Sequence, residues 1–444
     1  MLKIYDVETA RRTILKRTSY ASASYPAATL QRTEELFGAG ITPPQAVAQI
    51  LDSVQTEGDA ALRRWSTLLE RSMPETFRVS VGAIEEAYRS LPDELSSALR
   101  TAAGRIRRFH ELQPLPNWET AELGGRLGQR VTPIGRVGVY VPGGTAPLPS
   151  SLLMSVIPAQ VAGVKQIVVC SPPPAHPVIL AAARICGIDE VYQLGGAQAI
   201  AALAFGAESV PKVDKIVGAG NLFVTLAKQQ VYGLVGLDGL AGPTETVVVA
   251  DGNARPAWVA ADLLAQAEHD RLATAILLTP DRALAEAVQA EAARQMEELS
   301  RAEIIAASLA DRSGIVLTPD LDTACSLASE FAAEHTCLAV KNPAELATRI
   351  QNAGGLFLGE HSFEVLGDYV AGPSHVMPTG GTARFASPLN VMDFVKITSV
   401  IALDDETGCE LSRLAGTIAR AESLTAHAAA ADFRAGGTPT GEGN

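Results

Sequence analysis

A regular alternation of short apolar segments with longer helical ones, between residues 136 and 358, is the feature that most constrains the fold. The apolar segments are rich in Val, Ile and Leu, and several end at glycine or proline. Continuous apolar strands separated by helices are typical of a mostly parallel sheet with helices on both faces. We therefore predict an α/β fold. The expected strands are 136–141, 166–170, 190–194, 215–217, 246–250, 275–278, 314–317, 337–340 and 355–358.

The alternation separates into two runs, and a chain of 444 residues is long enough for more than one domain. The first run gives a candidate domain at about 118–243, and a second α/β run follows it. We expect the helical N-terminal region, about 42–112, to pack with the second run. Residues 406–433 are expected to form one long Ala-rich helix. A terminal helix with no following strand is suited to docking on a partner subunit.

Charge and composition exclude several classes of protein. Lys and Arg total 36 and Asp and Glu total 49, so the formal net charge is 36 − 49 = −13. An acidic chain without a basic stripe is a poor ligand for nucleic acid or an anionic membrane. No apolar run reaches the length of a membrane span, and the N-terminus does not read as a signal peptide. Five scattered cysteines without a CxxC pair favour a reducing cytoplasm.

Three glycine-bearing turns follow successive expected strands, at 142–144, 195–196 and 218–220. Ligands bind at the carboxyl ends of the strands in open α/β sheets, and glycines let a phosphate approach the backbone. Gly218-x-Gly220 resembles the start of a dinucleotide fingerprint, but Phe223 stands where its third glycine would be. The turns therefore indicate either a nucleotide site or ordinary turn chemistry.

A few of the seven histidines stand near acidic or amide side chains. Gln266 and His269 lie three residues apart at the end of an expected helix and can face one point. Asp368 and His375 flank a loop rich in glycine and proline, while His427 lies on the terminal helix. Imidazole, carboxylate and amide donors without thiolates suit a zinc site that can add substrate atoms. An isolated histidine is more often a satisfied structural residue, so this prediction requires the donors to converge.

An adjacent carboxyl and imidazole, Glu334-His335, stand just before the expected strand 337–340. Histidine titrates near neutral pH, and burial can raise the pKa of a glutamate toward the same range, so the two could act as bases in one site. Glu268-His269 and Glu360-His361 are further pairs of the same kind. The pair alone therefore does not identify an active site.

Taken together, these segments resemble the histidinol dehydrogenase family. The similarity runs from about residue 135 to 427, in the family's order and approximate spacing. The matching segments are GVYVPGGTAPLPSSLLM, QLGGAQAIAALAFGAESVPKVDKIVGAGN, LAGPTETVVVAD, DLLAQAEHD, AAEHTCLAV, GDYVAGPSHVMPTGGTARFASPL and AESLTAH.

The resemblance implies oxidation of L-histidinol through its aldehyde to L-histidine with NAD, the last steps of histidine biosynthesis, in the cytoplasm. It implies one zinc ion per subunit, which anchors the substrate. His335 would take the hydroxyl proton, and Glu334 would activate the water that adds to the aldehyde. The implied zinc ligands are Gln266, His269, Asp368 and, from the other subunit, His427. The implied NAD contacts are Tyr140, Gln198 and Asn221. Besides the zinc ligands and His335, the implied substrate contacts are Thr244, His375 and Glu422.

The resemblance also implies a homodimer of two incomplete Rossmann-like domains with small extended terminal segments. In this chain the N-terminal segment would be 1–29, and the first domain 30–117 with 244–388. The second domain, with the NAD contacts, would be 118–243. The C-terminal helical segment, 389–444, would exchange between subunits.

Three departures from the family pattern are mild: Thr244 for Ser, Ala219 for Pro and Met377 for Leu. A related branch oxidises sulfonated diols, although the GTARF and AESLTAH segments favour histidinol. A zinc hydrolase and a non-catalytic metal-binding scaffold are the alternatives from other classes. Gln266-x-x-His269 is not the HExxH motif of a hydrolase, and a scaffold would not need Glu334-His335.

Overall fold

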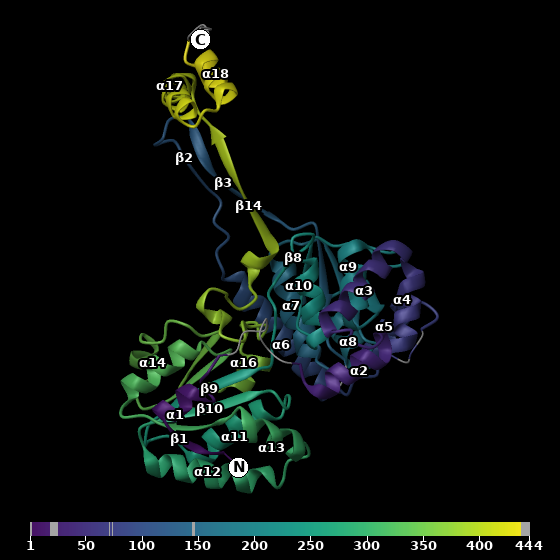
Figure 1. Ribbon diagram of the computed structural model, residues 1–444, viewed down its shortest axis with the longest axis vertical. Coiled ribbons are helices and arrows are strands. Elements are labelled where there is room, and N and C mark those ends of the chain that lie inside the picture. Colours follow the sequence, from purple (N-terminus) through teal and green to yellow (C-terminus); the bar gives the residue numbers. More distant parts are fainter. Residues whose placement is uncertain (1, 18–24, 71, 73, 144–146, 437–444) are drawn as a thin grey trace. The chain divides into compact units, whose positions relative to one another are not determined.

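The computed structural model describes residues 2–17, 25–70, 72, 74–143 and 147–436 (Figure 1). Gly144, part of the first predicted glycine turn, and the last eight residues of the chain lie outside these ranges. The chain divides into two compact units. The first contains residues 1–113 and 134–394, and the second contains 114–133 and 395–444.

A six-stranded parallel sheet forms one half of the first unit, in the order β1-β11-β10-β9-β12-β13. Its strands are β1 (Ile4–Asp6), β9 (Glu245–Ala250), β10 (Thr274–Thr279), β11 (Gly314–Leu317), β12 (His335–Ala339) and β13 (Gly355–Leu358). Along β9, Val248 and Ala250 contact one helical layer while Val247 and Val249 contact the other. Both faces are therefore covered, which explains why the central strands are continuously apolar.

The two layers on this sheet come from different parts of the chain. One layer consists of α11 (Pro256–Ala267), α12 (Arg282–Met296) and α13 (Ala302–Asp311). The other consists of α1 (Val7–Arg12), α14 (Leu321–Phe331) and α15 (Pro343–Ala347). A short helix, α16 (Glu364–Tyr369), follows β13.

A five-stranded parallel sheet forms the other half, in the order β6-β5-β4-β7-β8. Its strands are β4 (Arg136–Tyr140), β5 (Gln166–Ser171), β6 (Val191–Gln193), β7 (Lys215–Val217) and β8 (Gly236–Leu237). The connecting helices are α7 (Pro149–Val161), α8 (Pro177–Ile185), α9 (Gly196–Phe205) and α10 (Leu222–Val231). All nine strands predicted from the sequence are found in these two sheets, with bounds that differ by at most two residues.

The N-terminal helices pack on the five-stranded half, as the neighbouring labels in Figure 1 show. They are α2 (Ala27–Phe37), α3 (Pro43–Glu57), α4 (Asp59–Trp65), a π-helical turn (Ser66–Glu70), α5 (Val81–Arg89) and α6 (Asp93–Glu111). Helix α3 packs against α9 and α10, α5 against α8, and α6 against α7. This corrects the expectation that the helical region would join the run after residue 243. An amphipathic pattern shows that a helix has a buried face but does not reveal which sheet covers it.

The second unit contains an antiparallel sheet and two helices. Its strands are β2 (Trp118–Thr120), β3 (Arg126–Pro133) and β14 (Val395–Ala402), and β3 lies between the other two. The helices are α17 (Asp405–Ala421) and α18 (Thr425–Arg434). The single helix predicted for 406–433 is therefore two helices, because Ser423 has a positive φ of 62° and interrupts the helical path. Residues 118–133 also belong here rather than to the parallel domain predicted at 118–243.

Among the described residues, no helix has the length and apolar character needed to cross a membrane.

Candidate active site

The carboxyl and imidazole of Glu334-His335 lie at the amino end of β12, beside the amino end of β9. The parallel register pairs His335 with Thr246. This pairing brings the Glu334 carboxyl to Thr244, whose hydroxyl donates to Glu334 Oε2 at 2.5 Å. The Glu245 N–H donates to the same oxygen at 3.2 Å. The register of two adjacent strands therefore fixes the position of this carboxyl.

Both ring nitrogens of His335 have fixed partners. Nδ1 donates to the Glu245 carbonyl oxygen at 3.2 Å, and Nε2 lies 3.3 Å from Oδ1 of Asp368 on α16. The ring of Phe357 on β13 lies beside the imidazole, with the ring centroids 5.8 Å apart. Fixed partners on both nitrogens hold the ring in one orientation, as a group that transfers a proton requires.

Burial and neighbouring charges shift the pKa values of this pair. Burial raises the pKa of Glu334 to about 7, although the charge of His335 and the Thr244 hydrogen bond oppose the shift. Burial alone would lower the pKa of His335. The hydrogen bond to Asp368 and the charges of Glu334 and Glu364 outweigh it and raise that pKa to about 10. Two groups with displaced pKa values in one buried site are typical of an acid/base centre.

Asp368 is the centre of a cluster of imidazoles. Besides the 3.3 Å contact with His335, its Oδ1 lies 3.9 Å from Nδ1 of His375. Ser151 on α7 fixes the other nitrogen of His375, Nε2, at 3.0 Å. Burial alone would raise the pKa of Asp368, but the hydrogen bond and positive charge of His335, together with His375 and His269, lower it. The predicted loop pair Asp368 and His375 is therefore brought together with His335.

Gln266 and His269 stand at the end of α11, on the same side of the sheet as Glu364. Gln266 is buried; its amide oxygen accepts from the Glu245 N–H at 2.8 Å, and its nitrogen donates to Glu364 at 3.2 Å. Burial lowers the pKa of His269, and the charge of Asp368 opposes that shift. Asp368 therefore lies near enough to His269 for their charges to interact.

The donors partly fit a zinc ion. Imidazole nitrogens and a carboxylate around Asp368 are the donor types that zinc prefers. The Gln266 amide oxygen is held by the Glu245 N–H, so Gln266 would have to rotate to become a ligand. In the described part of the chain, no group of three or more His, Cys, Asp or Glu side chains is arranged to hold a metal ion.

A cavity of about 630 Å³ joins the glycine-bearing turns of the five-stranded sheet to His269. The three predicted NAD contacts, Tyr140, Gln198 and Asn221, all line it. The Tyr140 hydroxyl accepts from the Gly196 N–H at 3.1 Å, and Asn221 Oδ1 caps α10 by accepting from the N–H groups of residues 223 and 224. The cavity is within the size range of cofactor pockets, and of the predicted zinc ligands His269 lines it.

One glycine of the predicted fingerprint is required by close packing. Gly218 has a φ of +108°, and a side chain there would collide with the carbonyl oxygen of Tyr140. The turn after β7 therefore lies directly against the end of β4, where the cavity begins.

Several buried polar groups at the site carried no recognisable signal in the sequence. Glu70, from the π-helical turn, lines the cavity beside Gln198, and burial raises its pKa to about 7. Neither side chain has a hydrogen-bond partner among the described residues. Glu364 is buried on α16, which raises its pKa to about 8. Isolated glutamates in helices match no motif, so only their positions in space reveal them.

Glu422 and His427 belong to the second unit. Glu422 caps the carboxyl end of α17, and His427 lies in the first turn of α18. Both side chains are exposed.

The fold and site define an α/β protein with a buried carboxyl–imidazole pair, Glu334-His335, and a cavity of about 630 Å³ that reaches His269. A family model described as histidinol dehydrogenase matches residues 41–435. Histidinol dehydrogenase of Thermus thermophilus is 52% identical over 393 residues, covering 88% of this chain and 95% of the relative. That of Deinococcus radiodurans is 50% identical over 429 residues, covering 95% and 98%. The chain belongs to the histidinol dehydrogenase family.

A solved structure agrees with the sequence relatives. The crystal structure of histidinol dehydrogenase from Elizabethkingia anophelis is 32% identical, covers 98% of each chain and superposes with a TM-score of 0.89. The similarity therefore extends to the fold over nearly the full length.

Proposed function

We propose that this chain is an NAD-dependent dehydrogenase that oxidises L-histidinol through L-histidinaldehyde to L-histidine. Family membership supports the substrate and the use of NAD. The observation that carries the chemistry is the Glu334-His335 pair, held by β9 and α16. His269, whose charge interacts with that of Asp368, lines the same cavity as Tyr140. An alcohol-to-acid oxidation needs a base for the alcohol and a second base for water, and this pair can supply both.

In the alcohol step, His335 receives the hydroxyl proton as the substrate carbon gives its hydride to NAD. The Glu245 carbonyl and Asp368 hold the imidazole in one plane, so its receiving nitrogen has a defined direction. Asp368 stabilises the protonated ring that forms in this step. A base assists such a transfer by roughly 10²–10⁴-fold.

In the aldehyde step, Glu334 takes a proton from the water that adds to the carbonyl. The resulting hydrate anion then gives its hydride to a second NAD and becomes the acid. With a pKa of about 7, Glu334 is sufficiently ionised near neutral pH to act as a base and basic enough to hold a proton. The Thr244 hydroxyl, 2.5 Å away, orients the carboxyl.

Zinc is part of the proposal, with Gln266, His269, Asp368 and the partner's His427 as ligands. When bound, the ion would anchor substrate nitrogens and thereby orient the alcohol carbon toward the nicotinamide. The interaction between the charges of Asp368 and His269 supports these two residues as ligands of one ion. His375 and Glu422 would then contact the substrate beside it.

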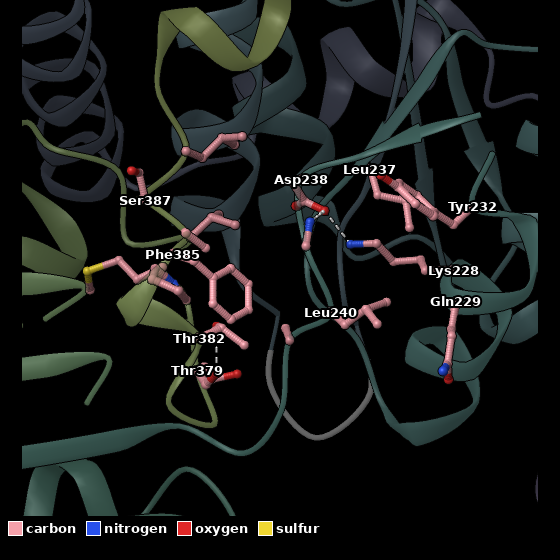
Figure 2. Close-up of a pocket in the computed structure, with 17 residues that line it drawn as sticks. Lys228, Gln229, Tyr232, Leu237, Asp238, Leu240, Thr379, Thr382, Phe385 and Ser387 are labelled. Carbon is pink, nitrogen blue, oxygen red and sulfur yellow. Dashed lines mark hydrogen bonds and ion pairs between the residues drawn. The ribbon is translucent and has the colours of Figure 1, made fainter. Parts of the chain in front are cut away.

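The dimer that this requires is supported by an exposed apolar surface on each unit. On the first unit, a cavity of about 410 Å³ is lined by 376–379 and 385–387, opposite Lys228, Tyr232 and Asp238. Figure 2 shows the Phe385 ring in this cavity, across from the ion-paired Lys228 and Asp238. Phe385 is 78% exposed, which is unusual for a large apolar side chain.

On the second unit, Leu411, Leu414 and Ile418 are exposed on α17. Their spacing of three and four residues places them on one face of the helix. We propose that these apolar surfaces are buried between two copies of the chain, so that the dimer also delivers His427.

The test is NADH formation from L-histidinol, followed by absorbance with and without a chelator. We expect two NADH per L-histidinol and loss of activity on chelation. A sulfonated diol serves as the competing substrate, and an amide or peptide tests the hydrolase alternative. Turnover of either in place of L-histidinol would contradict the proposal.

A further inference from the structure

Arg17, which follows α1, reaches the two segments that carry the acid/base pair. Its guanidinium forms a forked ion pair with both carboxylate oxygens of Glu245, one contact being 2.9 Å from Nη2 to Oε2. Its Nε donates to the carbonyl oxygen of Phe331 at 3.0 Å. The same guanidinium stacks on the Phe331 ring, 3.5 Å from the ring centroid.

Both partners of Arg17 lie close to the proposed acid/base pair, Glu334 and His335. The Glu245 N–H donates to Glu334, and the Glu245 carbonyl accepts from His335. Phe331 is the last residue of α14, three positions before Glu334. The turn between them contains Ala332 with a positive φ of 51°, so its path needs support from outside. The guanidinium of Arg17 therefore links the start of β9 to the turn that leads into β12.

The surroundings of Arg17 are built to receive it. Glu245 is buried, and burial raises its pKa while Arg17 opposes the shift. Gly381 lies over the guanidinium with a φ of +79°, and a side chain there would approach Arg17 Nε to 3.2 Å. A buried ion pair contributes little to stability by itself because its desolvation offsets the attraction. Its retention beside the acid/base pair points to positioning.

We propose that Arg17 is a positioning residue for the dehydrogenase reaction. It clamps Glu245 to the α14–β12 turn and so fixes the direction of both Glu334 and His335. The proposal rests on the proposed function, because it assumes that these two groups perform the two oxidation steps. A displacement of about 1 Å in such a group can cost on the order of 10²-fold in rate.

The first experiment replaces Arg17 and measures each half-reaction separately. For Arg17→Met we expect kcat to fall on the order of 10²-fold with both L-histidinol and L-histidinaldehyde, while KM for NAD changes less than about threefold. Arg17→Ala should regain part of its kcat when guanidinium is added at millimolar concentration, because the free ion can occupy the fork. Equal kcat for wild type and Arg17→Met would overturn the proposal.

A neighbouring ion pair supplies the matched control. Arg11 on α1 pairs with Glu330 on α14, so it also links the N-terminal segment to α14. Both side chains of this pair are half-exposed. It has no contact with Glu245. Arg11→Met should retain the wild-type kcat. A loss equal to that of Arg17→Met would mean that loosening the N-terminal segment at any point lowers kcat. That result would contradict a specific positioning role for Arg17.

A double variant separates positioning from folding. Arg17→Met leaves a buried carboxylate without its cation and should lower the melting temperature, whereas Arg17→Met with Glu245→Gln removes both charges and should restore it. We expect kcat of the double variant to stay low, because the contact with Phe331 is still missing. Recovery of kcat together with stability would refute positioning.

His335→Asn, measured in parallel, distinguishes this inference from the proposed function. If His335→Asn is inactive and Arg17→Met is fully active, the clamp alone fails. If His335→Asn has wild-type activity, the assignment of the acid/base pair fails, and the clamp fails with it.

Discussion

The two parallel sheets of the first unit contribute to the site from opposite ends of their strands. In the five-stranded sheet, Tyr140 is the last residue of β4, and the turn 195–196 and Asn221 follow the carboxyl ends of β6 and β7. In the six-stranded sheet, Thr244, Glu334 and His335 stand at the amino ends of β9 and β12. The general rule that ligands bind at carboxyl ends therefore locates the proposed cofactor contacts and misses the proposed proton-transfer groups.

The carboxyl end of β9 shows why the second sheet departs from the rule. Asp251, the first residue after the strand, accepts from the N–H groups of Asn253 and Lys341. Its carboxylate is therefore used to shape the turn. At the amino end, the strand order instead brings Glu334 beside Thr244, which lets a buried hydrogen bond form between residues 90 positions apart.

The largest expected effect tests the amino-end assignment. His335→Asn should lower kcat with L-histidinol by about 10²–10⁴-fold, because the hydroxyl proton loses its acceptor. The Kd for NAD, measured by isothermal titration calorimetry, should be unchanged, since His335 belongs to the other sheet. A variant that binds NAD weakly but retains kcat would reverse the assignment of the two sheets.

Glu334→Gln should show a smaller and more selective loss. We expect the aldehyde half-reaction to slow on the order of 10²-fold and the alcohol half-reaction much less. In the wild type, the rate from L-histidinaldehyde should fall as the pH drops below about 7, because protonated Glu334 cannot act as a base. Equal losses in both half-reactions of Glu334→Gln would contradict the assignment of the alcohol step to His335 and the aldehyde step to Glu334.

His427→Asn extends the comparison to the second unit. Removing one ligand of four should reduce zinc retention by tenfold or more, measured as metal content after dialysis against a weak chelator. Full metal content would rule His427 out as a ligand. Mixing this variant with an inactive His335→Asn variant should restore activity in heterodimers, because each copy would supply what the other lacks.

Asn221→Ala should give the smallest effect, confined to the carboxyl-end side. Loss of one neutral hydrogen bond costs about 1 kcal/mol, which corresponds to a rise in KM for NAD of roughly fivefold. The KM for L-histidinol should stay constant. Because Asn221 also caps α10, a melting experiment is needed to show that the helix is retained. A change in the KM for L-histidinol without a change in the KM for NAD would contradict the assignment of Asn221 to the cofactor side.

Much of this fold could be predicted from the sequence, and the omissions have physical reasons. Strands such as Thr246–Ala250 are buried on both faces, so their composition alone identifies them. Strand β3 is half exposed and contains Arg126 and Arg130, and it lacks that signature. The placement of α3 depends on long-range packing that a helical pattern does not encode.

The site was predicted through a resemblance rather than through local chemistry. Spacing alone left Glu334-His335 equivalent to two other Glu-His pairs. The structure distinguishes it, because both of its side chains are buried and hydrogen-bonded, whereas His361 is exposed and His269 lines the cavity. Arg17 and Glu70 match no motif, since their contacts join segments more than 100 positions apart.

If NAD binds as proposed, the cavity of about 630 Å³ that reaches from the five-stranded sheet to His269 has a kinetic consequence. Two electron pairs leave the same substrate carbon in succession, so two oxidised dinucleotides must occupy that space one after the other. Because the proposed NAD contacts and the proposed zinc ligands on α11 and α16 belong to different halves of the unit, NADH would be able to leave while the aldehyde stays bound. The bound aldehyde would thus be protected from reaction with amines in solution until the next NAD binds.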